Sequence, residues 1–156
     1  MQLTDVEYAG FWVRVGAALI DTLIVVALTF PLLIWIYGWS YFSGETTFFA
    51  GPADFLISWV APATAIIAFW LYLQATPGKL ALSLRVVDAT TGNTLSIGQS
   101  IGRYLGYFVS IIPLCLGLIW VGFDRRKQGW HDKLAGTVVI RSKTHGTEPV
   151  RFEPKR

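Results

Sequence analysis

Three long stretches of this sequence contain no charged residue, and they constrain the fold more than any other feature. Residues 22–44, 55–78 and 104–123 have no Asp, Glu, Lys or Arg over 23, 24 and 20 consecutive positions. A helix needs about 20 mostly apolar residues to cross the hydrocarbon core of a bilayer. Only 15% of the chain is charged and 53% is hydrophobic, whereas a soluble domain is about 25% charged. We therefore expect an integral membrane protein whose main partner is the lipid bilayer.

The first two stretches predict a helical hairpin. The first helix is expected from about Gly10 to Trp35, and the second from about Asp54 to Ala75. The connection between them contains no Lys or Arg, whereas nine of the thirteen Lys and Arg residues of the chain follow position 124. Loops rich in Lys and Arg stay on the cytoplasmic side of a membrane. Both ends of the hairpin and both chain termini are therefore expected in the cytoplasm.

The third stretch contains Pro113 near its centre, and its path is open. A proline removes a helical hydrogen bond, so residues 96–112 and 114–123 form either a hairpin of two short helices or one kinked span. Basic residues on both flanks favour the hairpin, because it keeps both flanks in the cytoplasm. The expected fold class is an all-α integral membrane protein: a helical hairpin plus a Pro-broken third segment, giving three transmembrane helices or two plus a hairpin.

Two β-prone runs, residues 80–88 and 136–141, lie on either side of the third stretch. A lone strand leaves its backbone hydrogen-bonding groups unpaired. We expect these runs to pair with each other in a small cytoplasmic sheet. Residues 1–143 would then form one membrane domain, followed by a basic, disordered tail at residues 144–156.

Arg14 and Asp21 are charged residues within the first apolar helix. They lie seven residues apart, about 10 Å along a helix axis, which is too far for a direct ion pair. Charged groups at membrane depth face a bundle interior or a water-filled cavity. The expected partners of Asp21 are Arg14 across water, Arg103 from the third segment, or a bound cation. Either the site exchanges a proton for a cation, or Arg14, Asp21 and Arg103 form a fixed polar brace.

The sequence contains none of the common enzyme or metal motifs. The two histidines are His131 and His145, and no Cys-x-x-Cys, His-Glu-x-x-His or phosphate-binding glycine loop occurs. We therefore expect a protein that is not an enzyme, has no cofactor and does not bind nucleic acid; whether it binds a metal is left open. His131 and Asp132 either sense pH or, as the better hypothesis, lie in a surface loop fixed by hydrogen bonds.

Three separated segments closely resemble the RDD family of bacterial and archaeal membrane proteins, which is named for one arginine and two aspartates. Arg14 and Asp21 match the arginine and the first aspartate, and Asp132 matches the second. The family is usually described as having three transmembrane segments. The resemblance covers about residues 7–141, and the segments that carry it are Phe11–Asp21, Thr76–Val87 and His131–Ile140.

The resemblance implies a multi-pass protein of the bacterial or archaeal cytoplasmic (inner) membrane. Some members have been proposed as antiporters of a monovalent cation and a proton, and others as small partners of another membrane protein. The first hypothesis here is an antiporter working as a homo-oligomer, with Asp21 as the titrating carboxylate and Arg14 tuning it. The alternative is a non-catalytic interaction module that regulates or assembles a membrane partner. A cytoplasmic structural motif is expected at Lys79, Arg85, His131 and Asp132, in which Lys79, Arg85 and Asp132 meet.

Overall fold

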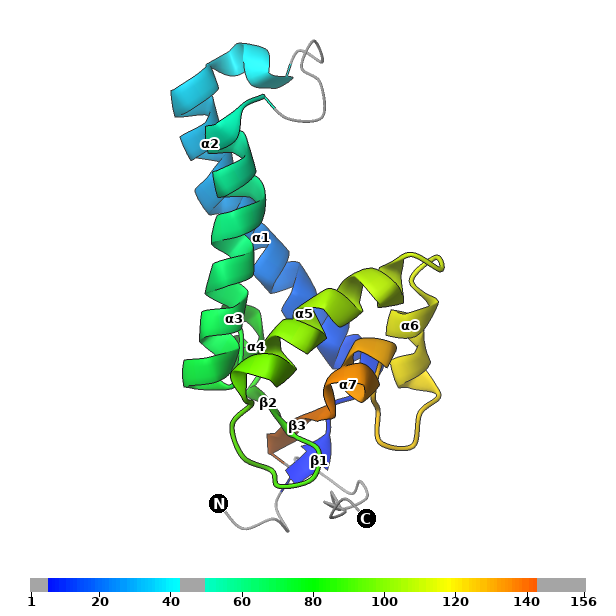
Figure 1. Ribbon diagram of the computed structural model, residues 1–156. Helices are drawn as coiled ribbons and strands as arrows, with labels where there is room; N and C mark the ends of the chain where they lie inside the picture. The colour runs from blue at the N-terminus through cyan, green and yellow to red at the C-terminus, as the bar shows by residue number, and fades with distance from the viewer. Residues whose placement is uncertain (1–5, 43–49, 143–156) are drawn as a thin grey trace.

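The computed structural model describes residues 6–42 and 50–142, so the expected tail at residues 144–156 lies outside the described residues. The described elements alternate long apolar helices with short helices and strands (Figure 1). In chain order they are β1 (Val6–Tyr8), α1 (Phe11–Tyr37), η2 (Trp39–Phe42), α2 (Pro52–Phe55), η3 (Leu56–Val60), α3 (Ala61–Leu73), α4 (Pro77–Ala81), β2 (Leu84–Asp88), α5 (Ile97–Ile111), α6 (Leu116–Ile119), η4 (Trp120–Gly122), α7 (Trp130–Ala135) and β3 (Thr137–Ser142).

A long helical hairpin is the largest feature of the molecule. One arm is α1, with 27 residues, and the other is the continuous helix Pro52–Leu73, with 22 residues. At 1.5 Å per residue these arms are about 40 and 33 Å long, enough to cross a core about 30 Å thick. Only 11% and 6% of their most apolar windows are buried within the chain. The predicted hairpin is confirmed, and lipid must cover most of its apolar surface.

The third apolar segment is broken, as expected. The chain bends by 112° between α5 and the helical segment Leu116–Gly122. Pro113 lies in the turn, and the two residues after it, Leu114 and Cys115, have positive φ angles of 52° and 62°. Figure 1 shows α5 rising beside the lower part of the long hairpin and α6 returning toward α7. The described part of the chain thus contains two helices able to span a membrane, or three candidate spans if the bent pair counts as one.

A three-stranded antiparallel sheet lies at the base of the hairpin, in the order β1-β3-β2. The expected pairing of the two β-prone runs is confirmed, with Val86 opposite Val139. The first run begins later than expected, because Pro77 starts the short helix α4 and the strand begins only at Leu84. The third strand, β1, was not expected from its three residues; it places Val6 opposite Ser142.

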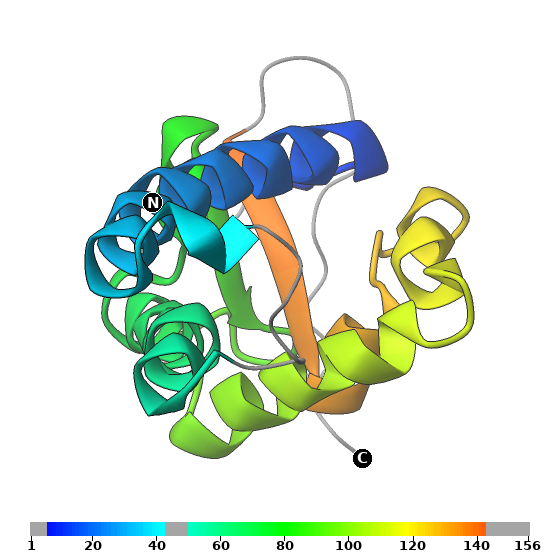
Figure 2. The ribbon, with the colours of Figure 1, turned by 90° about the horizontal axis from the view of Figure 1, so that it is seen from above.

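The sheet, α4 and α7 together form a unit that we call the cap. In Figure 2 the long strand β3 crosses beneath the helices. The buried core runs from the helices into the cap and includes Ala17, Trp70, Val86 and Val139. Burial of these side chains fixes the inner ends of α1, α3 and α5 against the sheet, and the candidate site residues lie at this junction.

Candidate functional site: an ion cluster and a cavity

Asp132 is the centre of a buried ion cluster at the junction of α1, α5 and α7. Its side chain is fully buried, and its Oδ2 lies 2.5 Å from NH1 of Arg14 while its Oδ1 lies 2.7 Å from NH2 of Arg103. The backbone N–H of Gly129 donates to Oδ2 at 3.0 Å. Arg14, Arg103 and Asp132, hereafter the ion cluster, therefore tie three helices that are distant in sequence to one carboxylate.

The two arginines of the ion cluster also bind the backbone and the sheet. Arg14 donates from Nε to the carbonyl of Ala9 at 3.0 Å and from NH2 to the carbonyl of Lys127 at 2.5 Å. Arg103 donates from NH1 to the hydroxyl of Thr137 at 2.8 Å. These bonds connect the start of α1, the loop before α7 and the start of β3. The charges of the cluster are therefore used in fixing the cap to the helices.

The electrostatics of the ion cluster favour a permanently ionised Asp132. Burial alone raises the pKa of a carboxyl group. The guanidinium groups of Arg103 and Arg14 outweigh that effect and hold the pKa of Asp132 well below its usual range. Asp132 therefore stays charged at physiological pH and acts as a fixed anion.

His131 lies inside the fold, so the expectation of a surface loop is wrong. It belongs to helix α7 and is 3% exposed. Its Nδ1 lies 3.3 Å from the Ser110 hydroxyl, and its ring stacks on Tyr107 with centroids 4.1 Å apart. Helix α5 approaches closely because a Cβ on Gly106 would lie 2.9 Å from the Cα of His131. Burial lowers the pKa of His131 to about 3, so the ring is neutral at physiological pH.

Asp21 binds α4 rather than an arginine. Its Oδ2 accepts a hydrogen bond from the Thr76 hydroxyl at 2.5 Å, and its Oδ1 accepts one from the Gly78 N–H at 2.7 Å. We call Asp21, Thr76 and Gly78 the latch. The expected contacts of Asp21 with Arg14 or Arg103 are not formed in the described part of the chain, because both guanidinium groups bind Asp132.

The glycine of the latch is required by close packing. A Cβ on Gly78 would lie 2.1 Å from the carbonyl oxygen of Ala17 on α1, a distance that no side chain can occupy. The Thr76-Pro77-Gly78 turn can therefore reach Asp21 because residue 78 has no side chain. The sequence predicted a turn here but gave no signal of this contact.

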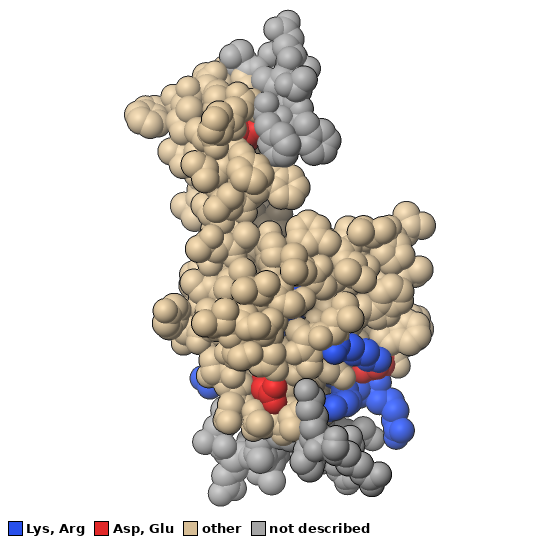
Figure 3. All heavy atoms as spheres, viewed as in Figure 1, with Lys and Arg blue, Asp and Glu red and all other residues tan. Residues whose placement is uncertain are grey.

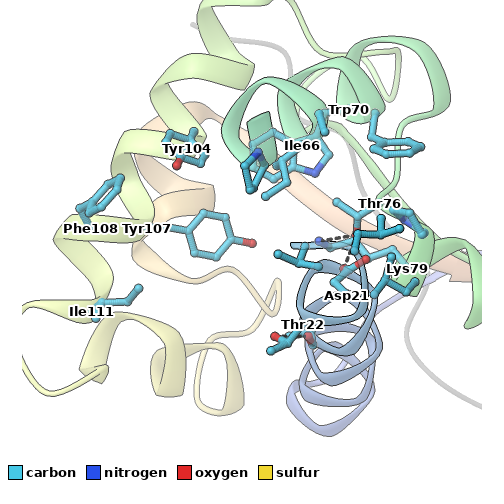
Figure 4. A pocket seen from close by; sticks show the side chains of 18 residues that line it. Asp21, Thr22, Ile66, Trp70, Thr76, Lys79, Tyr104, Tyr107, Phe108 and Ile111 are labelled. Carbon is cyan, nitrogen blue, oxygen red and sulfur yellow. Dashed lines mark hydrogen bonds between the residues drawn. The ribbon is translucent and has the colours of Figure 1, made fainter. Parts of the chain in front are cut away.

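The latch forms part of the wall of a cavity of about 440 Å³ between α1, α3, α4 and α5. Figure 4 shows Asp21, Thr76 and Lys79 together on one side, the Tyr107 hydroxyl directed toward them, and Phe108 and Ile111 across the cavity. Lys79 is 9% exposed and donates to the Thr76 hydroxyl at 3.4 Å. Burial lowers the pKa of Lys79. The cavity therefore combines apolar walls with one polar end.

The expected meeting of Lys79, Arg85 and Asp132 does not occur. Lys79 lines the cavity, with its ammonium 5.9 Å from the centroid of the Trp70 ring, while Asp132 is held in the ion cluster. Arg85 is exposed on β2. The strand alternates its side chains between two faces, and the buried neighbours of Arg85 take the inner face.

The opposite end of the hairpin holds a polar group that the sequence reasoning missed. Asp54 is 5% exposed and accepts hydrogen bonds at 2.8 Å from the hydroxyls of Tyr41 and Ser58 and at 3.0 Å from the N–H of Ala50. An aspartate at the start of a helix, beside aromatic residues, could have predicted this polar group from the sequence. Across residues 6–42 and 50–142, no group of three or more His, Cys, Asp or Glu side chains could hold a metal ion.

The fold and its buried polar contacts define a small multi-pass membrane protein in which a β-containing cap is held against the helices by charges of opposite sign. The chain belongs to the RDD family, whose model matches residues 8–136. Arg14, Asp21 and Asp132, which resemble the arginine and two aspartates of the family name, are divided between the ion cluster, which holds Arg14 and Asp132, and the latch, which holds Asp21.

Several bacterial proteins are similar to the chain. The uncharacterized membrane protein YteJ of Bacillus subtilis is 32% identical over 152 residues, covering 92% of this chain and 87% of that protein. The uncharacterized protein YxaI of the same organism is 31% identical, covering 85% and 96%. The uncharacterized protein RP437 of Rickettsia prowazekii is 41% identical over 76 residues, covering 49% of this chain and 42% of that protein. No solved structure matches the chain with significance.

Proposed function

We propose that the chain is a non-enzymatic ion-binding transport protein that exchanges a monovalent cation and a proton at Asp21. The main support for this proposal is the position of the Asp21 carboxylate. It lies within α1, the longer of the two apolar helices that could span a membrane in the described chain, and its side chain lines the cavity between the helices. Ionisable side chains at membrane depth that face a cavity are typical of ion and proton pathways.

The surroundings of Asp21 support competition between a proton and a cation. Its hydrogen-bond partners are neutral donors, the Thr76 hydroxyl and the Gly78 N–H, so no arginine neutralises its charge within the described chain. The Thr76 and Thr22 hydroxyl oxygens line the same cavity, and monovalent cations bind such oxygens. A proton or a cation would each neutralise the carboxylate, and binding of one would release the other.

The proposed transport requires more than one copy of the chain. The cavity is bounded by parts of four helices of a single chain, whereas a route across a bilayer must extend about 30 Å. We therefore propose a homo-oligomer in which neighbouring copies complete the route beside the long hairpin.

The proposed orientation places the cap in the cytoplasm of a bacterial or archaeal inner membrane. Figure 3 shows Lys and Arg side chains gathered at the cap end, whereas the hairpin arm carries none on that face. The first and last described strands, β1 and β3, pair with each other, so both ends of the described chain lie on one side. The positive-inside rule then supports cytoplasmic termini and a re-entrant α5–α6 hairpin.

A second candidate function is a membrane interaction module that regulates or assembles a partner membrane protein. The ion cluster favours it, because Arg14, Arg103 and Asp132 act on one another and on the cap. If the chain is an interaction module, the charges of the ion cluster only stabilise the fold, and the lipid-facing hairpin binds the partner.

Flux measurements separate the two candidates. The purified chain is reconstituted into liposomes that contain a pH-sensitive dye, and Na⁺, K⁺ or Li⁺ gradients are applied. We expect cation-driven proton flux that Asp21→Asn abolishes, while Asp124→Asn, which removes the carboxylate that pairs with Lys133 and does not line the cavity, keeps it. Absence of flux for every ion from a verified oligomer would overturn the transport proposal and favour the interaction module.

A further inference from the structure

We propose that the cavity between α1, α3, α4 and α5 binds an anionic amphiphile, with its apolar chain among the helices and its carboxylate or phosphate head group on Lys79. The proposal goes beyond ion exchange at Asp21, because it concerns a different group of the cavity and a different class of ligand.

The cavity has the chemical division that an amphiphile requires. Its volume of about 440 Å³ falls within the range of about 300 to 1,000 Å³ that is usual for small-molecule sites. Most of its wall is apolar, including Leu28, Ile66, Phe69 and Phe108. The charged groups lie together on one side, as Figure 4 shows for Asp21 and Lys79.

Lys79 is a buried cation that forms no ion pair with any carboxylate of the described residues. An ammonium group has three donors, but within the described chain Lys79 has one hydrogen bond, the long contact of 3.4 Å to the Thr76 hydroxyl. Asp21 does not form an ion pair with it; both Asp21 oxygens accept from Thr76 and Gly78. Buried charges are normally paired. The unused donors of Lys79 therefore require acceptors, and an anionic head group supplies them.

Trp70 provides a second, independent indication. Two cations lie near its ring, with the Lys79 ammonium 5.9 Å and the Arg103 guanidinium 5.1 Å from the ring centroid. Its Nε1 is buried and has no acceptor among the described residues, although Trp70 lines the cavity. Lys79 and Trp70 therefore both present hydrogen-bond donors that are unused within the described chain.

The charge balance around this end of the cavity also favours an anion. Three cations, Arg14, Lys79 and Arg103, face two carboxylates, Asp21 and Asp132, which leaves one positive charge. The position fits a membrane ligand, because α4 is the part of the cap that lies at the base of the hairpin (Figure 1). An amphiphile in this cavity would place its head group at the α4 end and its chain along the hairpin.

Photolabelling tests the site without an ion gradient, so its outcome is independent of the flux proposal. The chain is placed in nanodiscs of zwitterionic phosphatidylcholine and labelled with palmitate that carries a diazirine on its chain. We expect crosslinks on the cavity-lining segments of α1, α3 and α5. Unlabelled palmitate and hexadecyl phosphate should compete, and hexadecanol, which has the same chain without a charge, should compete at least tenfold more weakly. Added phosphatidylglycerol should compete with the label if the site takes a phospholipid, and should not compete if the site takes only a free fatty acid.

Variants locate the head group and the chain. Lys79→Met keeps the length of the side chain but removes the charge, and should weaken palmitate binding about tenfold or more. Arg85→Met, an exposed control, should not weaken it.

Ala65→Phe fills the cavity from an exposed wall position and should abolish labelling. Equal competition by hexadecanol and palmitate on the unmodified chain would overturn the anionic head group. Unchanged labelling of a folded Ala65→Phe variant would overturn the site.

Discussion

Asp132 and Asp21 are both aspartates at the junction of helices and cap, but their surroundings differ. Asp132 is fully buried and is held by two guanidinium groups. Asp21 is partly exposed, is held by a hydroxyl and a backbone N–H, and lines a cavity. The first carboxylate is neutralised within the chain, whereas the second is only hydrogen-bonded.

The difference separates a structural role from a functional one. A buried carboxylate paired with two arginines cannot accept another cation without breaking the junction of three helices. A carboxylate held by neutral donors keeps a negative charge that a ligand can neutralise. The two sites should therefore respond in opposite ways: substitution in the ion cluster should damage the fold, and substitution of Asp21 should damage function with a small effect on the fold.

Asp132→Asn should have the largest effect on stability. It leaves Arg14 and Arg103 buried without their carboxylate, and removing one partner of a buried ion pair costs about 3 to 5 kcal/mol. We expect little folded protein in the membrane fraction and a strongly lowered melting temperature in detergent. Asp124→Asn is the control, because its Lys133 partner is 45% exposed. An unchanged melting temperature for Asp132→Asn would contradict the structural role of the ion cluster.

Gly78→Ala tests the latch through its backbone. The added Cβ would lie 2.1 Å from the carbonyl oxygen of Ala17, so α4 must move away from α1. Overpacking of this kind costs about 1 to 3 kcal/mol, which thermal unfolding of the purified variant would detect. Gly102→Ala is the matched control, because nothing lies within 4 Å of its Cβ and alanine favours a helix over glycine. Equal destabilisation by both variants would show that the close approach at Gly78 is not required.

The spans and the two-strand pairing were predictable from the sequence because they depend on local patterns. Charge-free length defines α1 and the helix Pro52–Leu73, and Pro113 marks the break between α5 and α6. These signals lie within one segment each, so no tertiary information is needed to interpret them. β1 was missed because its three residues form a strand only through pairing with β3.

The partners of the charged residues were not predictable because they depend on tertiary contacts. Arg14 and Arg103 were expected near Asp21, but both bind Asp132, which lies 118 residues after Arg14. The latch depends likewise on Gly78, whose close contact with Ala17 is not indicated by any pattern in the sequence. Sequence spacing identifies which residues need partners, and only the assembled cap determines which partner each obtains.

The stability of the fold should depend on pH through His131. Its folded pKa of about 3 lies below the value of about 6.5 for an exposed histidine, so the unfolded chain binds the proton first. The contribution of His131 to stability is complete above pH 6.5 and is lost as the pH falls toward 3. At pH 5 the loss is about 2 kcal/mol relative to pH 7. Melting temperatures at the two pH values would measure it.

The matched variant for the pH experiment is His131→Gln, which does not titrate. Its melting temperature should change less between pH 7 and pH 5 than that of the unmodified chain. Asp132 does not interfere, because its lowered pKa affects stability only below the ordinary aspartate value of about 4. The same pH dependence in both chains would show that His131 is not the responsible group.

Asp21→Asn should have the smallest effect on stability, in contrast to Asp132→Asn. Asn keeps one oxygen acceptor, and Asp21 is partly exposed and paired with neutral donors, so the loss should be about 1 kcal/mol, the net worth of one hydrogen bond. Thermal unfolding of Asp21→Asn and Asp132→Asn under the same conditions ranks their losses of stability. If Asp21→Asn destabilises the chain as much as Asp132→Asn does, both aspartates are braces. A well-folded Asp21→Asn that loses ion exchange would instead assign structure to the ion cluster and function to the cavity, because the two substitutions remove the same charge from opposite surroundings.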